Sequence, residues 1–131
     1  KIKTIVHLET ISTDQMSTND KALSYKVNIF GSMNLLEFAK IKKIKNFIFA
    51  SSEWVYGSFK NNEIKKIISK IDIEKLDSSY AKTKAIMERI ITSSEKLNFS
   101  ILRFGIIYGK KTSNYSAVES IVEQVKNKSS I

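Results

Sequence analysis

The 131-residue sequence contains no cysteine, no proline and a single histidine, His7. Without cysteine the chain forms no disulfide and no thiolate metal site, and one histidine excludes a multi-histidine metal site. We therefore predict no metal centre. The lack of cysteine is compatible with a reducing compartment, and we expect a cytoplasmic protein.

Long hydrophobic runs are also missing. No stretch of about 18 apolar residues occurs, which predicts the absence of a membrane-spanning helix. Lys1 leads directly into a short apolar run that lacks the longer apolar core and cleavage site of a signal peptide. The hydrophobic fraction of 42% is typical of a globular chain, and the length fits one domain that buries a core.

The formal net charge is +9, and lysine accounts for all the basic residues except Arg89 and Arg103. One interpretation is a basic face that binds nucleic acid or another anion. The other is compositional bias, because Ile, Lys, Asn and Ser are abundant, as an AT-rich genome would produce. No nucleic-acid-binding motif accompanies the charge, so we favour bias and expect no nucleic-acid partner. A steep salt dependence of binding would favour the first interpretation.

Apolar patterns divide the chain into alternating strands and helices. Short apolar runs predict strands at residues 2–8, 46–50 and 99–104, and spacings of three and four predict helices at 21–40, 80–96 and 117–126. This alternation predicts an α/β fold with a doubly wound parallel sheet, because continuous apolar strands are typical of a sheet covered on both faces. Residues 58–77 are rich in lysine and are interpreted as a variable surface insert within a single domain, 1–131.

Polar residues at the strand ends are the candidates for chemistry, because ligands of such sheets lie beyond the carboxyl ends of the strands. Ser51 and Ser52 leave the second strand there, and a hydroxyl at this place can hydrogen-bond a reacting oxygen. Tyr80 and Lys84 lie four residues apart, on one helix face. An ammonium group beside a phenol lowers the phenol's pKa, so we expect Tyr80 to act as an acid/base group.

Each of these signals has an alternative interpretation. Tyr56 and Lys60 show the same spacing, but this second pair follows a strand and spans Gly57, so no regular helix face joins it. One or both of Ser51 and Ser52 could simply satisfy backbone groups where the strand ends.

Five motifs occur in a fixed order along the chain. They are Val6-His7-Leu8, Asn28-Ile29-Phe30-Gly31-Ser32-Met33-Asn34-Leu35-Leu36, Ser51-Ser52-Glu53-Trp54-Val55-Tyr56-Gly57, Tyr80-Ala81-Lys82-Thr83-Lys84, and Leu102-Arg103-Phe104-Gly105 with Tyr108-Gly109. This ordered set resembles the extended short-chain dehydrogenases/reductases of the nucleotide-sugar epimerase/dehydratase type. The resemblance implies a Rossmann-like domain, NAD as cofactor (or NADP) and a nucleotide-sugar substrate.

The resemblance also implies roles for individual residues. Ser52 matches the catalytic serine, Tyr80 the acid/base, and Lys84 the residue that tunes it and hydrogen-bonds the nicotinamide ribose. Ser51 would support Ser52 near the nicotinamide, and Asn28 would make a structural or cofactor-side contact. The residues that would flank the cofactor are Leu8, Glu9 and Phe104.

The chain departs from the family pattern at several positions. Glu9-Thr10 replaces a small Ala-Ala pair, and Ile106 replaces a frequent Asn. Dehydratases of the group usually carry Thr-Asp-Glu where this chain has Ser52-Glu53-Trp54. Glu53 is then the possible acid, or a solvated turn carboxylate, and the resemblance favours epimerisation or reduction over dehydration.

The glycine-rich phosphate loop of the family belongs upstream of Lys1, so we expect a partial NAD-binding domain that alone binds NAD weakly and is inactive. An alternative is a catalytically silent binding or regulatory homologue. An intact upstream glycine loop would favour the enzyme. The resemblance further implies a homodimer through helices 21–40 and 80–96, both apolar over a wide arc.

Overall fold

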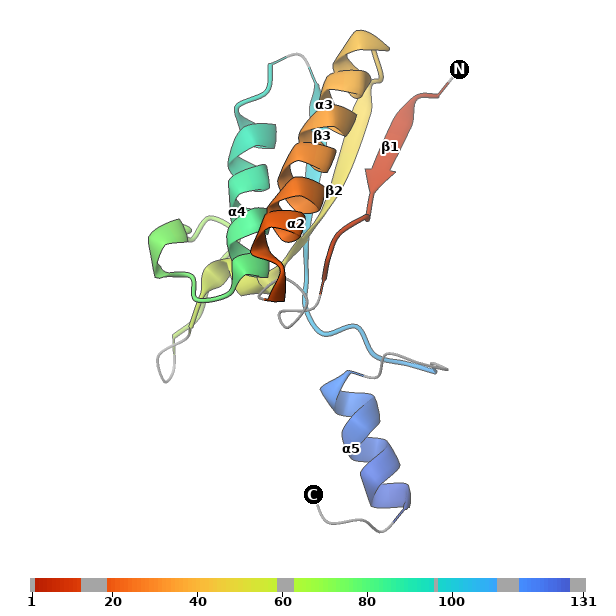
Figure 1. Ribbon diagram of the computed structural model, residues 1–131, viewed down its shortest axis with the longest axis vertical. Coiled ribbons are helices and arrows are strands. Elements are labelled where there is room, and N and C mark those ends of the chain that lie inside the picture. The colour runs from red at the N-terminus through yellow and green to blue at the C-terminus, as the bar shows by residue number, and fades with distance from the viewer. Residues whose placement is uncertain (1, 13–18, 59–62, 96, 111–115, 128–131) are drawn as a thin grey trace.

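A computed structural model gives the fold and describes residues 2–12, 19–58, 63–95, 97–110 and 116–127. Strands and helices alternate along the chain, as the apolar pattern predicts (Figure 1). The strands are β1 (Thr4–His7), β2 (Asn46–Ser52) and β3 (Asn98–Phe104). The longer helices are α2 (Lys21–Tyr25), α3 (Ser32–Ile41), α4 (Ser79–Thr92) and α5 (Ala117–Lys126).

The three strands form one parallel sheet in the order β1-β2-β3. The register places Phe49 of β2 between His7 of β1 and Ile101 of β3. Because all three strands run in one direction, their carboxyl ends lie at the same edge of the sheet. The predicted α/β fold, a partial Rossmann-like sheet, is confirmed.

Helices α3 and α4 pack on one face of this sheet (Figure 1). Their core joins buried Leu36 and Met87 to Phe47 and Phe49 of β2. Each helix connects a strand to its next neighbour in the same direction, and right-handed crossovers of this kind place both helices on one face. Among the described residues no helix covers the other face, so this part of the structure shows one helix layer of the predicted doubly wound fold.

The predicted helix 21–40 is helical over its whole length, but its hydrogen bonding changes in the middle. A π-helical segment, η1 (Lys26–Gly31), lies between α2 and α3. Asp20 caps the start, because its side chain accepts a 2.8 Å hydrogen bond from the N–H of Leu23. Single π-helical turns are frequent at functional sites, and Asn28 lies within this one.

The lysine-rich region 58–77 is not entirely a surface segment. It contains a 3-10 turn, η3 (Ile73–Lys75), and Leu76 is buried against Val55, Ala81 and Ala85. This small second core packs the end of the region against the start of α4, next to the predicted catalytic residues.

Helix α5 spans the predicted residues and begins with a capping box between Ser116 and Glu119. It lies apart from the sheet and the other helices (Figure 1). None of the described helices is long and apolar enough to cross a membrane.

Replacing Met87 by Ala should lower the free energy of unfolding by about 2–5 kcal/mol, because Met87 is 0% exposed and its loss leaves a cavity between α4 and the sheet. The control is Ile68→Ala. Ile68 is 90% exposed, and its replacement should change stability by only about 0.5 kcal/mol. Urea unfolding of both variants measures the difference, and equal losses would contradict this packing.

Candidate active site

The carboxyl end of β2 turns directly into a short 3-10 helix, η2 (Glu53–Tyr56). Ser52 caps this helix, because its hydroxyl oxygen accepts a 3.3 Å hydrogen bond from the N–H of Trp54. Gly57 ends the turn with a φ of 71°, which strains residues with a side chain. The local sequence thus fixes the direction in which Ser52 leaves the sheet.

Tyr80 lies in the first turn of α4, opposite this strand end. Ser78 caps the helix by accepting a hydrogen bond from the N–H of Ala81. The side chain of Ser52 lies close enough to the half-buried Tyr80 to lower the pKa of the phenol. The ring of Trp54 meets that of Tyr80 edge-on, with centroids 6.2 Å apart. The structure therefore brings together two of the predicted catalytic residues, Ser52 and Tyr80.

Lys84 lies one turn further along α4 and is only 3% exposed. Its Nζ donates a 2.8 Å hydrogen bond to the carbonyl of Ala50, and it lies 4.8 Å from the ring centroid of Phe49 and 5.7 Å from that of Tyr80. Burial lowers the pKa of Lys84 from 10.5 to about 8, because the charged ammonium loses contact with water.

The pKa of Tyr80 differs from the expectation. We predicted that Lys84 lowers it, but burial raises the pKa of Tyr80 above its ordinary value, and only the hydrogen bond with Ser52 acts in the opposite direction. The geometry explains the difference, since the Lys84 nitrogen lies over the phenol ring and directs its hydrogen bond to Ala50.

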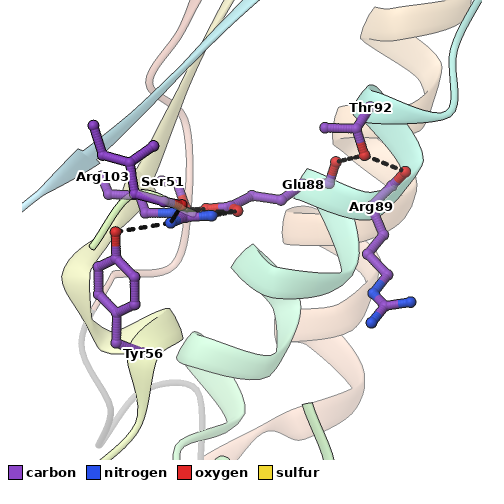
Figure 2. A network of polar contacts seen from close by, with 7 residues as sticks. Ser51, Tyr56, Glu88, Arg89, Thr92 and Arg103 are labelled. Carbon is purple, nitrogen blue, oxygen red and sulfur yellow. Dashed lines mark hydrogen bonds and ion pairs between the residues drawn. The ribbon is translucent and has the colours of Figure 1, made fainter. Parts of the chain in front are cut away.

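Ser51 and Ser52 have different surroundings. Ser51 is buried on the helix-covered side, and its hydroxyl donates a 2.5 Å hydrogen bond to Oε1 of Glu88 on α4 (Figure 2). The structure thus gives the hydroxyl of Ser51 a protein partner, while Ser52 faces Tyr80. The cofactor contact of Ser51 stays a prediction.

Asn28 holds three parts of the chain together. Its side-chain oxygen accepts from the N–H of Ile11 at 2.8 Å, and its nitrogen donates to the Ile11 carbonyl and to Oγ1 of Thr83, both at 3.2 Å. These bonds join the loop after β1 to η1 and to α4. The geometry favours the structural alternative for Asn28 over a direct contact with a cofactor.

The remaining predicted residues lie around the same edge of the sheet. Leu8, Glu9 and Phe104 are exposed beyond or at the ends of β1 and β3. The carboxylate of Glu53 lies against Gly105, where a Cβ atom would come within 3.0 Å of its Oε2. Lys60, of the second Tyr/Lys pair, lies outside the described residues.

The sequence reasoning missed the partners of Ser51. Glu88 and Arg103 form a largely buried ion pair, with Arg103 Nη2 2.7 Å from Glu88 Oε2. Two features of the sequence could have indicated this pair. Glu88 places a charge on the sheet-facing side of α4, one turn after Lys84, and Arg103 lies near the end of an apolar strand. No cluster of potential metal ligands occurs among the residues that the structure describes.

Comparisons with known proteins show the family of the chain. The family model for the NAD dependent epimerase/dehydratase family matches residues 1–131. A dTDP-D-glucose 4,6-dehydratase of Dictyostelium discoideum is 32% identical over 121 residues, which cover 85% of this chain and 28% of that protein. The chain belongs to the NAD-dependent epimerase/dehydratase family.

Solved structures related to this epimerase/dehydratase chain share its fold. A UDP-N-acetylglucosamine 4-epimerase from Methanobrevibacter ruminantium, in complex with UDP-N-acetylmuramic acid, is 26% identical with a TM-score of 0.83, and the match covers 98% of this chain and 42% of that one. The UDP-glucose 4-epimerase of Thermus thermophilus, in complex with NAD, has a TM-score of 0.84 at 24% identity, over 99% and 43% of the two chains. The chain therefore spans less than half the length of these relatives.

The free energy of unfolding of this epimerase/dehydratase chain, compared with that of its Lys84→Met variant, should depend on pH. The folded-state pKa of Lys84, about 8, lies below 10.5, so the folded state binds fewer protons than the unfolded state between these values. The stability of the unchanged chain relative to Lys84→Met should therefore rise from pH 8 to pH 10.5, by up to about 3 kcal/mol. Urea unfolding at several pH values measures this, and a difference that stays constant would show that Lys84 titrates normally.

Proposed function

We propose that the protein is an NAD(P)-dependent enzyme that acts on a nucleotide sugar by hydride transfer at a carbinol carbon. The observation that carries this proposal is the juxtaposition of Ser52 and Tyr80 at the carboxyl end of β2, with the buried Lys84 one helical turn away. Membership of the NAD-dependent epimerase/dehydratase family supports it.

In this proposal the protein's own residues move the proton. Tyr80, in its phenolate form, takes the proton from the sugar hydroxyl and returns it later, as a general base and then a general acid. Burial opposes the phenolate form, and Ser52 favours it. Ser52 hydrogen-bonds the same sugar oxygen and holds the phenol in place. A bound NAD would supply the acceptor, and later the donor, of the hydride at the carbinol carbon.

The donor set of the site fits a nicotinamide cofactor. An ammonium group has more than one N–H donor, and Lys84 directs one of them to Ala50, so further donors remain for the ribose hydroxyls. Leu8 and Phe104 expose apolar surface near this edge of the sheet, and we propose that they flank the nicotinamide, with Glu9 beside them.

Epimerisation is the form of the reaction that we favour. Ser52-Glu53-Trp54 offers one carboxylate, and the Glu53 side chain lies against Gly105. A pocket of about 360 Å³ opens beside Trp54 and is also lined by Glu53, Asp77 and Ser78. Its aromatic and hydroxyl-binding groups suit a sugar ring, and we assign the glycosyl part of the substrate to this side of Tyr80.

Replacing Tyr80 by Phe in the full-length enzyme should reduce turnover by about 10²–10⁴-fold, because the proton carrier is lost while the ring is kept. Cofactor affinity and folding should stay nearly unchanged. Ser52→Ala should cost less, since it removes a hydrogen-bonding group and not the proton carrier. Lys84→Met should impair both turnover and cofactor binding. Steady-state kinetics and calorimetric titration with NAD measure these effects.

Two controls accompany this series. Tyr25→Phe makes the same chemical change on α2 and should leave turnover unchanged. Lys60→Met tests the second Tyr/Lys pair and should also be nearly silent. Normal turnover of Tyr80→Phe would contradict the assignment and favour the catalytically silent homologue.

We also propose that the enzyme is a homodimer through the outer faces of the helical segment 21–41 and of α4. Phe30, Met33 and Phe38 are exposed there, and an apolar helix face in solvent favours a second packing partner. The exposed apolar arc is narrower than the sequence suggested, because Leu36 and Ile91 on these helices are buried in the core of the single chain.

Introducing Asp at both Met33 and Phe38 should convert the full-length dimer into a monomer, because two charges would be buried in the interface. Light scattering across a range of concentrations measures the change. Ile68→Asp, at a residue that is 90% exposed in the region 58–77, is the control and should leave the dimer intact. A full-length protein that is already monomeric at high concentration would refute this proposal.

A further inference from the structure

A buried polar network lies directly behind the catalytic strand end (Figure 2). The guanidinium group of Arg103 on β3 donates to both carboxylate oxygens of Glu88, from Nε at 3.0 and 3.2 Å and from Nη2 at 2.7 Å. Its Nη1 donates to the hydroxyl of Tyr56 at 2.8 Å and to the carbonyl of Ile67 at 3.0 Å. Ser51 completes the network through its bond to Glu88.

Burying the ion pair costs free energy, because both charged groups lose contact with water. The side chain of Glu88 is 5% exposed and that of Arg103 is 19% exposed. The cost of removing two charges from water largely offsets their attraction, so a buried ion pair often stabilises a fold no better than well-packed apolar side chains. What this pair adds is a fixed geometry, because a two-pronged contact between guanidinium and carboxylate permits few orientations.

The network holds the chain on both sides of Ser52. Before it, Ser51 is bonded to Glu88; after it, Tyr56 at the end of η2 is bonded to Arg103. Lys84 adds a further bond from α4 to the carbonyl of Ala50. Glu88, Lys84 and Tyr80 follow one another at intervals of four on α4, so the helix that carries the phenol also carries the anchors of the strand end.

We infer that the Glu88–Arg103 ion pair is a positioning device, which holds the side chain of Ser52 within hydrogen-bonding distance of Tyr80. This inference rests on the proposed function for its catalytic consequence. Neither residue is assigned a contact with substrate or cofactor; both act through the backbone of residues 51–56.

Glu88→Gln is the sharpest test, because it keeps the size of the side chain and an oxygen that accepts from Ser51. It loses the charge and presents an amide N–H to the guanidinium group, so the two-pronged contact cannot persist. Turnover of the full-length enzyme should fall about 10²-fold, the usual effect of a displacement of about 1 Å in an active site. The KM for the sugar and the affinity for NAD should stay close to their original values.

A milder variant and a matched control complete the set. Tyr56→Phe removes one hydroxyl that accepts from Arg103 and should reduce turnover in the same direction by a smaller factor. Asp72→Asn neutralises an acid in an exposed ion pair, with Lys75 at 3.2 Å, and should leave turnover unchanged. A loss of stability in Glu88→Gln with an unchanged kcat would show a merely structural role and overturn the inference.

The pKa of Tyr80 provides a readout that needs no turnover. The groups that face Tyr80 are Ser52 from β2, Trp54 from η2 and Lys84 from its own helix. If Glu88→Gln releases Ser52, the hydrogen bond that lowers the phenol's pKa weakens, so the pKa should rise. The loss of a negative charge by itself would lower the pKa of a nearby phenol, because it favours phenolate. The direction in which the pKa of Tyr80 changes therefore distinguishes a displacement of Ser52 from a direct effect of the lost charge on the phenol.

Carbon-13 NMR of protein labelled at the tyrosine Cζ measures this pKa, with Tyr80→Phe used to assign the signal. A rise in Glu88→Gln and, by a smaller amount, in Tyr56→Phe, but not in Asp72→Asn, would support the inference. An unchanged or lowered pKa in Glu88→Gln would refute it. If the unchanged protein turns over no nucleotide sugar while the pKa still rises, the proposed function fails and the positioning role stands.

Discussion

The packing of α4 against the end of β2 is the constraint on which the candidate site depends. Two hydrogen bonds one helical turn apart fix this contact, from Lys84 to the carbonyl of Ala50 and from Ser51 to Glu88. The strand ends at Ser52, directly after these two residues, and Tyr80 at the start of the helix faces it. By the positioning role that we infer, a change in either bond would displace Ser52 from Tyr80, and the proposed chemistry requires both hydroxyl groups at the same sugar oxygen.

Burial has opposite consequences for the two ionisable residues of this site. It disfavours charge, so it raises the pKa of Tyr80 and lowers that of Lys84 to about 8. The result is a phenol that keeps its proton and an amine whose proton is held less firmly than in water. The hydrogen bond between Ser52 and Tyr80 opposes the first effect. The accuracy with which Ser52 is held therefore influences how readily the phenol can give up its proton.

The sheet shows why one strand end can hold several functional groups. Parallel strands place their carboxyl ends at one edge, so Leu8, Ser52 and Phe104 come from distant parts of the chain to the same place. The helix-covered side of that edge holds the charged network of Glu88 and Arg103, and Ser51 connects it to the strand. Adjacent serines with different partners thus link the supporting network to the candidate chemistry.

The sequence by itself determined the order of the elements and named the candidate residues of the site. Apolar spacing predicted the strands and α5, and the ordered motifs identified Ser52, Tyr80 and Lys84 before any geometry was known, because periodicity and motif spacing are local properties. Only the tertiary structure decided the partners of the polar side chains. It placed Asn28 in a structural network, directed Lys84 to Ala50, joined Ser51 to Glu88 and buried Leu36 and Ile91 in the core. These outcomes depend on contacts between residues far apart in the chain and on the loss of water around them, which no local pattern records.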